Sequence, residues 1–460
     1  MVRRSRMNTD LATRLRDHAR DAALFPEPGR VLLAVSGGPD SLAMLDLMVR
    51  VAPELEIQLA VAHVDHGIAD ESPDVAEHVL GLAVRYNLPG YLVTLKLGRT
   101  ASETAARNGR YAALRSMQER TGSRYLATAH HADDQIETIL LRIFRGTGVA
   151  GLAGIRDTGP GGLVRPLLPF RKEELADWLA PMHQRLLPHR DPANADMRHD
   201  RSWVREELLP LVRSRFGRAV DGWLLDVGRH AAAERHAWST TLRVVRELDF
   251  RSSRGVAEVA RAPLLEYDNA LSEVLLRALA REVGCVLGPR RAARLWAFAQ
   301  HASSGRTFDI GQHWVAEIAF GRLRIFKLKK ETGNADHPSV PWGEGDEGWV
   351  QWGGWEIRWV HEPAGAPVRD SLVTWVTPGL GEIRSWMPGD RIRPFGGVGR
   401  RRVSRVLMEG KIPRSERATY PLVARAGRVI WLPGICRSDA AVPSVGEPAI
   451  RLEARDGPAT

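Results

Sequence analysis

The sequence predicts an α/β protein with an open, mainly parallel, doubly wound sheet, followed by a mainly helical segment and a small α+β domain. Strand-like and helix-like patterns alternate through residues 1–220, and such alternation is typical of parallel sheets covered by helices. Longer helical periodicities replace the alternation in residues 221–330. Short strand-like runs return in residues 349–460, after a polar segment rich in glycine, proline and acids that we interpret as a linker over 331–348.

In the first 220 residues, the apolar runs and the periodic segments can be placed one by one. Strands are predicted at 31–35, 57–64, 91–97 and 124–129, with a short one at 163–168, and helices at about 8–24, 40–51, 73–87, 103–121 and 133–145. Ligands of doubly wound sheets bind beyond the carboxyl ends of the strands. We therefore expect the polar segments after the first, second and fourth strands to face one crevice.

The turn after the first strand, Ser36-Gly37-Gly38-Pro39-Asp40-Ser41, is the most informative segment. Adjacent glycines let backbone N–H groups converge on an anion, and the start of the following helix favours negative charge. Ser36 and Ser41 can donate hydroxyls to phosphate oxygens. Asp40 would repel phosphate, so we expect it to hold Mg²⁺. A serine-capped turn without a ligand is the alternative, but it explains neither the second serine nor Asp40.

A second polar segment follows the predicted strand at 124–129. His130 and His131 precede Asp133, Asp134 and Glu137 at the start of an amphipathic helix. Simple capping is one interpretation, because carboxylates are favoured at a helix N-terminus. The other is an acidic wall of the same crevice that holds a metal or a cationic substrate. The glycine-rich run at 145–154 is a candidate lid.

Composition and charge restrict the class of protein. No apolar run approaches the ~20 residues needed to span a bilayer, and two cysteines, Cys285 and Cys436, cannot make a disulfide framework. We therefore expect a cytoplasmic protein without membrane partners. Residues 384–437 contain thirteen Arg or Lys against three acids, which accounts for the whole net charge of +10. This basic segment suits a polyanion such as nucleic acid, although a solvated surface explains it equally well.

Taken together, these segments resemble the bacterial tRNA(Ile)-lysidine synthetases, N-type ATP pyrophosphatases of the PP-loop superfamily. The resemblance covers about the first 215 residues, and the basic segment resembles the C-terminal tRNA-binding domain of long family members. This chain departs from the family at Ile68-Ala69, where an arginine that contacts phosphate is usual, and at Ala193 and Ser202. The matching segments are Ser36–Ser41, Val64–Gly67, residues 103–111 with Arg107 and Arg110, Asp133–Thr138, Arg145–Gly148, Arg165–Leu167, Asp191–Asn194, Arg201 and Arg205.

The resemblance implies an activity. ATP adenylates the C2 oxygen of the wobble cytidine in an isoleucine tRNA with a CAU anticodon, and free L-lysine then displaces AMP to give lysidine. ATP and Mg²⁺ are the implied cofactors, and a homodimer is compatible with the family.

Residue roles carry over from the same resemblance. The catalytic set is Asp40, Asp134, Arg107 and Arg205; Asp134, with Asp133 as second choice, binds lysine; and Asp40 binds the metal. ATP binding is expected at Ser36, Gly37, Gly38, Pro39, Asp40, Ser41 and His63, and tRNA binding at Arg201, Arg205, Arg391, Arg393, Arg400, Arg401 and Arg402.

Two other functions are compatible with these motifs. A related loop enzyme could thiolate tRNA, but sulfur transfer generally needs a cysteine, and neither cysteine falls in the predicted crevice segments. A tRNA-binding protein with a relic loop is the second, although a relic need not retain Asp40. Magnesium-dependent release of pyrophosphate separates an enzyme from a relic.

Overall fold

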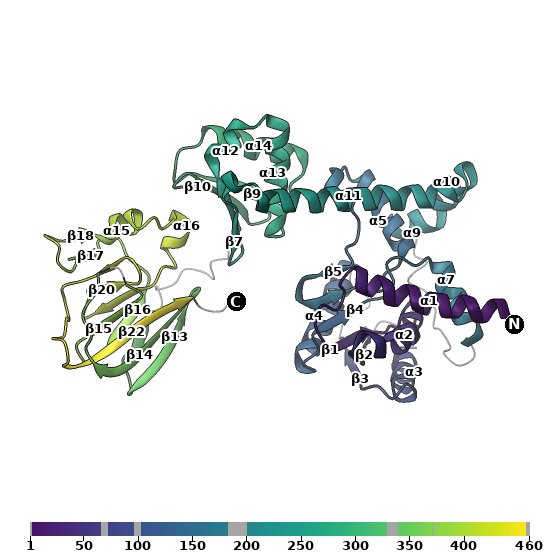
Figure 1. Ribbon diagram of the computed structural model, residues 1–460, viewed down its shortest axis with the longest axis horizontal. Helices are drawn as coiled ribbons and strands as arrows, with labels where there is room; N and C mark the ends of the chain where they lie inside the picture. The colour runs from purple at the N-terminus through teal and green to yellow at the C-terminus, as the bar shows by residue number, and fades with distance from the viewer. Residues whose placement is uncertain are drawn as a thin grey trace. The chain divides into compact units, whose positions relative to one another are not determined.

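A computed structural model describes residues 2–65, 72–95, 103–182, 200–328, 339–369 and 371–456. The chain divides into two compact units, Met1–Arg235 and His236–Thr460, whose elements can be followed along the colour gradient in Figure 1. The division falls within helix α11 (Ala219–Val244), which continues past the boundary predicted at residue 220. The finer division into 1–220, 221–330, 331–348 and 349–460 stays a prediction.

The first unit contains the predicted doubly wound sheet. Its strands lie in the order β3-β2-β1-β4-β6-β5, and all neighbours are parallel except β5 and β6. The order reverses between β1 and β4, and ligands of doubly wound sheets bind where the segments after two such strands leave the sheet. The strands are β1 (Gly29–Ala34), β2 (Ile57–Asp65), β3 (Gly90–Thr94), β4 (Tyr125–Ala127), β5 (Thr158–Gly159) and β6 (Leu163–Val164).

Helices cover both faces of this sheet. The predicted helices are found, although the first begins six residues earlier than expected, whereas α6, α7, α9 and α10 are short and were not predicted. The helices are α1 (Val2–Asp21), α2 (Pro39–Val51), α3 (Ser72–Arg85), α4 (Glu103–Arg120), α5 (Ala132–Phe144), α6 (Val149–Leu152), α7 (Lys172–Leu179), α9 (Asp200–Trp203) and α10 (Leu209–Phe216), with a π-helical turn at Val204–Leu208.

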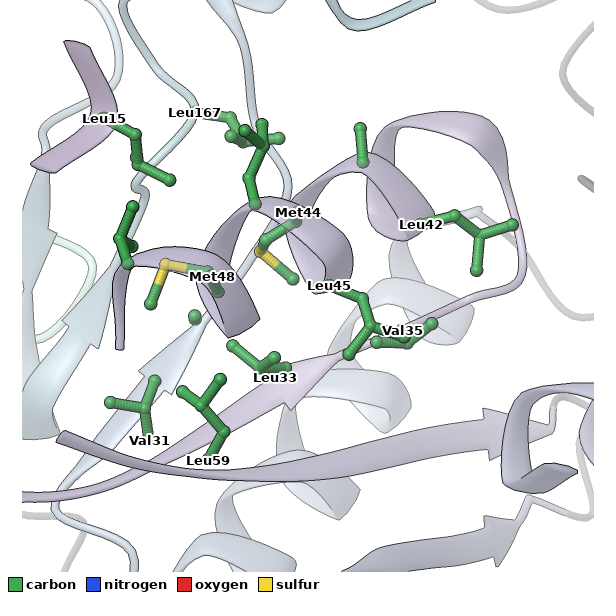
Figure 2. Close-up of a cluster of buried hydrophobic side chains, with 14 of the residues drawn as sticks. Leu15, Val31, Leu33, Val35, Leu42, Met44, Leu45, Met48, Leu59 and Leu167 are labelled. Atoms are coloured by element: carbon green, nitrogen blue, oxygen red, sulfur yellow. The ribbon is translucent and has the colours of Figure 1, made fainter. Parts of the chain in front are cut away.

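Strand β1 is buried on both faces, which explains its continuous apolar sequence. Val31, Leu33 and Val35 pack with residues of α2 such as Leu45, as Figure 2 shows. Leu32 points to the other face and packs with residues of α4. Each fully buried aliphatic side chain contributes about 1.5–3 kcal/mol, so the strand that leads into the Ser36–Ser41 turn is firmly held.

Helix α2 is further fixed by a buried carboxylate. Asp46 is 3% exposed and accepts hydrogen bonds from the Tyr86 hydroxyl at 2.8 Å and from Trp178 Nε1 at 2.9 Å. Arg50 donates to it from the next turn at 2.8 Å. Because Trp178 lies on α7, this carboxylate ties the helix after the glycine turn to a distant part of the unit.

The first half of the second unit contains helices, as the sequence predicted, together with a sheet. It contains an antiparallel sheet in the order β7-β8-β11-β10-β9. The chain turns at Phe320-Gly321, between the strands Trp314–Ala319 and Arg322–Lys327, with positive φ at both residues. Strand β7 was missed because its three residues are all exposed and polar. The elements are β7 (Arg251–Ser253), β8 (Val256–Ala260), α12 (Arg261–Glu266), α13 (Asn269–Glu282), α14 (Pro289–His301), β9 (Thr307–Gly311), β10 (Trp314–Ala319) and β11 (Arg322–Lys327).

The last part of the chain is α+β, as predicted, and begins inside the predicted linker. Residues 331–338 lie outside the described residues, but Trp342, within 331–348, is fully buried in a core with Trp431 and Ile450. The elements are β12 (Val340–Trp342), β13 (Glu347–Trp352), β14 (Trp355–Pro363), β15 (Val373–Val376), β16 (Gly381–Arg384), β17 (Arg391–Ile392), β18 (Arg401–Arg402), α15 (Val403–Glu409), α16 (Arg414–Arg417), β19 (Leu422–Arg425), β20 (Arg428–Leu432), β21 (Cys436–Arg437) and β22 (Pro448–Asp456).

These strands form two larger sheets, in the orders β12-β16-β19-β20-β21 and β13-β14-β22-β15, and a small β17-β18 pair. In the part of the chain that the structure describes, no helix is long and apolar enough to cross a membrane.

Candidate functional site

The Ser36–Ser41 turn forms a compact loop at the carboxyl end of β1. Gly37 has a φ of +83°, which favours glycine, and Gly38 begins α2 without a side-chain cap. Ser41 Oγ donates to the Gly38 carbonyl at 2.8 Å, and the Ser36 amide donates to Ser41 Oγ at 3.2 Å. The first N–H groups of α2 therefore remain available to an anion in this loop.

His63 lies at the end of the neighbouring strand β2 and is buried. Its Nδ1 is 2.8 Å from the carbonyl oxygen of Val35, the residue before the turn, so a protonated Nδ1 donates to that carbonyl. Burial lowers the pKa of His63, against the opposing effect of this hydrogen bond. The imidazole is therefore neutral at pH 7 and braces β2 against the start of the loop. His66 lies outside the described residues.

His131 connects the glycine turn to helix α5. Its Nε2 lies 3.6 Å from Asp40 Oδ2 and 3.6 Å from Asp134 Oδ2, and the ring is 3% exposed. Burial lowers the pKa of His131, but the carboxylates of Asp40, Asp134 and Asp133 outweigh it, so the pKa is raised. The structure thus brings Asp40 and Asp134 to the same nitrogen of one imidazole.

Asp133 points into a network of arginines from later in the chain. Arg171 Nη2 contacts its Oδ1 at 2.7 Å, and the Lys172 amide donates to Oδ2 at 2.8 Å. Arg171 and Arg213 also bind buried Asp221, at 2.6 and 3.0 Å. Both oxygens of Asp133 are therefore engaged in joining α5 to α7, α10 and α11, which favours a structural role over binding of lysine.

Asp134 and Glu137 form the wall of the crevice together with two arginines. Arg201 donates to Asp134 at 2.9 Å and to Glu137 at 2.7 Å. Arg205 donates twice to Glu137, at 2.6 and 3.0 Å. Glu137 is only 2% exposed, so these arginines compensate a charge that could not remain buried alone. The two arginines expected to contact tRNA thus lie against carboxylates of α5.

Arg107 and Arg165 form a different kind of arginine pair. The Arg107 guanidinium lies 5.4 Å from the ring centroid of Tyr111, and Arg165 hydrogen-bonds to Tyr111 and donates to the Arg156 carbonyl at 2.6 Å. Burial lowers the pKa of Arg165, and the nearby charge of Arg107 lowers it further. The charge of Asp157 opposes the effect of Arg107, so the charge of Arg165 is partly compensated.

The glycine-rich run after α5 is anchored at its end. Gln135 exchanges two hydrogen bonds with the backbone of Ile155, at 2.7 and 2.5 Å, and Arg142 donates to the carbonyl of Gly154 at 2.9 Å. Gly154 has a φ of +61°, and a Cβ there would overlap the Gln135 side chain. Arg142 and Gln135 therefore hold the candidate lid against α5.

The basic residues of the last part of the chain are mostly exposed. Arg391 on β17 lies directly opposite Arg402 on β18, which is an unfavourable pairing of like charges. Arg400 is exposed, Arg393 pairs with Asp439 at 3.0 Å, and Arg401 binds Glu409. A phosphate anion between Arg391 and Arg402 would relieve their repulsion.

Sequence reasoning missed several residues of this site. Arg171, Arg213 and Asp221 reach α5 from other elements and leave no local signal. Glu137 was not missed: the sequence placed it with Asp133 and Asp134 in the acidic segment, one turn after Asp134 and therefore on the same face of the helix. The Asp191–Asn194 segment, His66 and Ile68-Ala69 lie outside the described residues.

Known proteins resemble this chain over nearly its whole length. Family profiles described as a PP-loop domain and as the TilS substrate C-terminal domain match residues 7–212 and 382–454. A tRNA(Ile)-lysidine synthase of Symbiobacterium thermophilum is 31% identical over 471 residues, which cover 94% of this chain and 95% of that protein. The protein of that name from Geobacter sulfurreducens is 31% identical over 460 residues, 93% of each chain. That from Novosphingobium aromaticivorans is 44% identical over 193 residues, 40% of this chain and 57% of that protein.

The network around Asp133 predicts a pH-dependent stability. Burial raises the pKa of Asp133, but the Lys172 amide and Arg171 outweigh it and hold the pKa below its usual value. Its contribution is therefore complete at neutral pH and is lost as the pH falls through the lowered pKa. Asp133→Asn should cost about 1–3 kcal/mol of unfolding free energy at pH 7, and the difference from the wild type should shrink below about pH 4.

Calorimetry of both proteins across this pH range measures the effect. The matched control is Asp200→Asn, which alters an exposed pair with Arg145 and should change stability by less than about 0.5 kcal/mol. Equal losses of unfolding free energy in Asp133→Asn and Asp200→Asn at pH 7 would show that the Asp133 network is not stabilising.

Proposed function

Since the chain belongs to the tRNA(Ile)-lysidine synthase family, we propose that it joins free L-lysine to C2 of the wobble cytidine in an isoleucine tRNA with a CAU anticodon. Membership of the family makes the chain an ATP-dependent tRNA-modifying enzyme. The observation that carries the proposal is the meeting of Asp40 and Asp134 at His131, between the loop after β1 and the helix after β4.

ATP is placed with its phosphates in the Ser36–Ser41 loop. Gly37 and Gly38 allow backbone N–H groups to approach the phosphates, and Ser36 and Ser41 supply hydroxyls. The N-terminus of α2 adds its partial positive charge. His63 supports the loop from β2 through the Val35 carbonyl.

Asp40 is the proposed ligand for Mg²⁺. Its side chain is 31% exposed beside the anion-binding loop, and Mg²⁺ usually takes one or two carboxylates together with substrate phosphates and water. Among the described residues, no group of three or more His, Cys, Asp or Glu is placed to hold a metal, so phosphate oxygens would complete the coordination. The donor set therefore fits the ion, which when bound neutralises the leaving pyrophosphate.

We propose that lysine binds with its ammonium at Asp134. Burial raises the pKa of Asp134, but His131 and Arg201 outweigh it, so the carboxylate is ionised at pH 7. The oxygens of Asp134 bind Arg201 and the His131 amide, as those of Asp133 bind Arg171 and Lys172, and we prefer Asp134 because it meets Asp40 at His131. Arg107 and Arg205 are proposed to stabilise the negative charge that develops at the α-phosphate.

The last part of the chain is proposed to bind tRNA. Arg391, Arg393, Arg400, Arg401 and Arg402 belong to a segment with a net charge of +10, and Arg391 and Arg402 lack local acidic compensation across their strand pair. Arg201 and Arg205 are also proposed to contact tRNA, beside the carboxylates of α5 that they bind.

Assembly as a homodimer is a separate prediction, which sedimentation of the purified chain tests.

Thiolation of tRNA is less consistent with the structure. Cys285 and Cys436 are 1% and 2% exposed, and both belong to the second unit. Burial raises the pKa of both thiols, that of Cys285 to about 11. A nucleophilic thiolate is therefore disfavoured at either residue.

The direct test is incubation of the full chain with ATP, Mg²⁺, labelled lysine and total tRNA, followed by mass spectrometry of nucleosides. Lysidine in the isoleucine tRNA is the expected product. Formation of sulfur-containing nucleosides in the presence of a sulfur donor would instead support tRNA thiolation. Binding of tRNA without release of pyrophosphate would support a tRNA-binding protein with a relic loop.

Asp40→Asn should reduce pyrophosphate release about 100-fold or more, because the amide carries no charge to hold Mg²⁺. The melting temperature should stay near that of the wild type, since Asp40 is partly exposed. Pyrophosphate release at the wild-type rate would exclude Asp40 as the metal ligand.

Asp134→Ala should raise the KM for lysine about tenfold to hundredfold, as expected for loss of roughly 1.5–3 kcal/mol. Arg201 keeps its bond to Glu137, so the wall should persist and adenylated tRNA should accumulate when lysine is limiting. Asp200→Ala, an exposed change on α9, is the control. Failure at adenylation instead would place the lysine site elsewhere.

The double variant Arg391→Gln/Arg402→Gln should weaken tRNA binding. The slope of the logarithm of the binding constant against the logarithm of salt concentration should become shallower by about one unit per lost phosphate contact. Arg358→Gln, on an exposed pair with Glu356 in the same part of the chain, is the control. An unchanged slope in the double variant would remove this strand pair from the interface.

A further inference from the structure

A carboxylate of the β7–β11 sheet is fully buried although it points away from the core of that sheet. Glu317 on β10 is 0% exposed, while its neighbours Ala316 and Ile318 pack into the core on the opposite face. Arg324 on β11 lies directly between Glu317 and Glu258 of β8 in the strand register, so all three share the outer face. Another part of the chain must therefore cover this face at Glu317.

The covering element is helix α16, from the last part of the chain. Ser415 Oγ donates to Glu317 Oε2 at 2.6 Å, and the Ser415 amide donates to Oε1 at 3.4 Å. Arg324 donates to Glu317 at 3.0 Å and to Ser415 Oγ at 3.2 Å, and it also binds Glu416. These four residues, which we call the α16 joint, form a buried ion pair completed by the helix.

A second contact joins the same two parts of the second unit at a different place. Arg254, in the turn between β7 and β8, has its guanidinium 5.6 Å from the ring centroid of Trp355 on β14. Trp355 in turn packs edge-on against Tyr420, at 5.4 Å between ring centroids. Two separate contacts fix an orientation, whereas a single contact would leave the two parts free to rotate about it.

The α16 joint is connected to the basic strand pair β17-β18 through a shared core. Tyr420, three residues after α16, belongs to one hydrophobic cluster with Leu407 of α15 and Ile392 of β17. Helix α15 begins directly after β18. The position of α16 on the β7–β11 sheet therefore also sets the position of Arg391 and Arg402 relative to that sheet.

This orientation matters if the tRNA meets the chain at two places. The proposed function puts the wobble cytidine in the crevice of the first unit and tRNA phosphates at β17-β18 in the second. Once one contact has formed, the strength of the other depends on how closely the chain holds it in the required position. Residues 329–338, which connect β11 to β12, lie outside the described residues, and the α16 joint links the two sides of this connection.

Resting on the proposed function, we propose that Glu317 and Arg324 are positioning residues for tRNA. By binding α16 they hold the basic strand pair in a fixed orientation on the β7–β11 sheet. Glu317 and Arg324 are 0% and 4% exposed, so they act through α16 and not by contact with tRNA. Opening the joint should weaken tRNA binding without removing a phosphate contact.

The test opens the joint from the side of α16. Ser415→Asp places a carboxylate against buried Glu317, where Arg324 already balances the charges of Glu258, Glu317 and Glu416, so repulsion should release the helix. Glu317→Gln/Ser415→Asp has the same net charge as the wild type, and the new carboxylate can pair with Arg324. This double variant should therefore close the joint again.

Double electron–electron resonance in the full chain measures whether the joint is closed. Nitroxide labels are attached through Ser303→Cys, after α14, and Met408→Cys, on α15, both at exposed positions. The native cysteines are 1% and 2% exposed and react poorly with the label. The distance distribution should be narrow in the labelled parent, broad with Ser415→Asp and narrow again in Glu317→Gln/Ser415→Asp.

Binding and kinetics with tRNA test the positioning role. Ser415→Asp should raise the Kd and the KM for tRNA about threefold to tenfold, and the double variant should restore both. The rate of lysidine formation at saturating tRNA should stay within about twofold of the wild type, and the salt slope of binding should not change, because no phosphate contact is lost. Thr419→Asp, an exposed change two residues after α16, adds the same charge and should match the wild type.

Three results would overturn the inference. These are a narrow distance distribution in Ser415→Asp, a broad distribution with unchanged tRNA affinity, and an equal loss of affinity in Thr419→Asp. Failure of the proposed function is distinct, because then the wild type forms no lysidine, whereas the distance and binding measurements do not depend on that product.

Discussion

Compensation of the carboxylates at the start of α5 is the interaction on which the crevice depends. Asp133, Asp134, Glu137 and Asp221 are largely removed from solvent, and each binds an arginine from elsewhere in the first unit. A buried charge without a partner is strongly destabilising. The arginines of α7, α9, α10 and the π-helical turn must therefore be in place before α5 can present Asp134 beside the glycine loop.

The arginines of the first unit fall into groups according to the side chains they bind. Arg171 and Arg213 bind Asp133 and Asp221 and join helices, whereas Arg201 and Arg205 complete the acidic wall. Arg107 and Arg165 instead both interact with Tyr111.

In the second unit, one buried arginine is neutralised, whereas two arginines of a strand pair are exposed. Its buried Arg324 is neutralised by Glu317 and Glu258 across the sheet, while Arg391 and Arg402 face each other at an exposed strand pair. Like charges at such a position lower stability unless a ligand neutralises them. A stable core with an uncompensated basic edge is the arrangement expected of a surface that meets phosphates.

The sequence by itself determined the doubly wound sheet, the glycine loop and the acidic start of α5, because alternation, adjacent glycines and helical periodicity are local signals. It also indicated the crevice, since parallel strands present their carboxyl ends at one edge. Only the tertiary structure decided what each charge does. Asp133 and Asp134 are neighbours in sequence, yet helical rotation points one at Arg171 and the other at Arg201. Trp342 likewise lies in the core and not in a linker. Its burial depends on strands more than 80 residues away in the sequence, such as the strand that contains Trp431. Partners brought together by folding leave no trace in the local pattern.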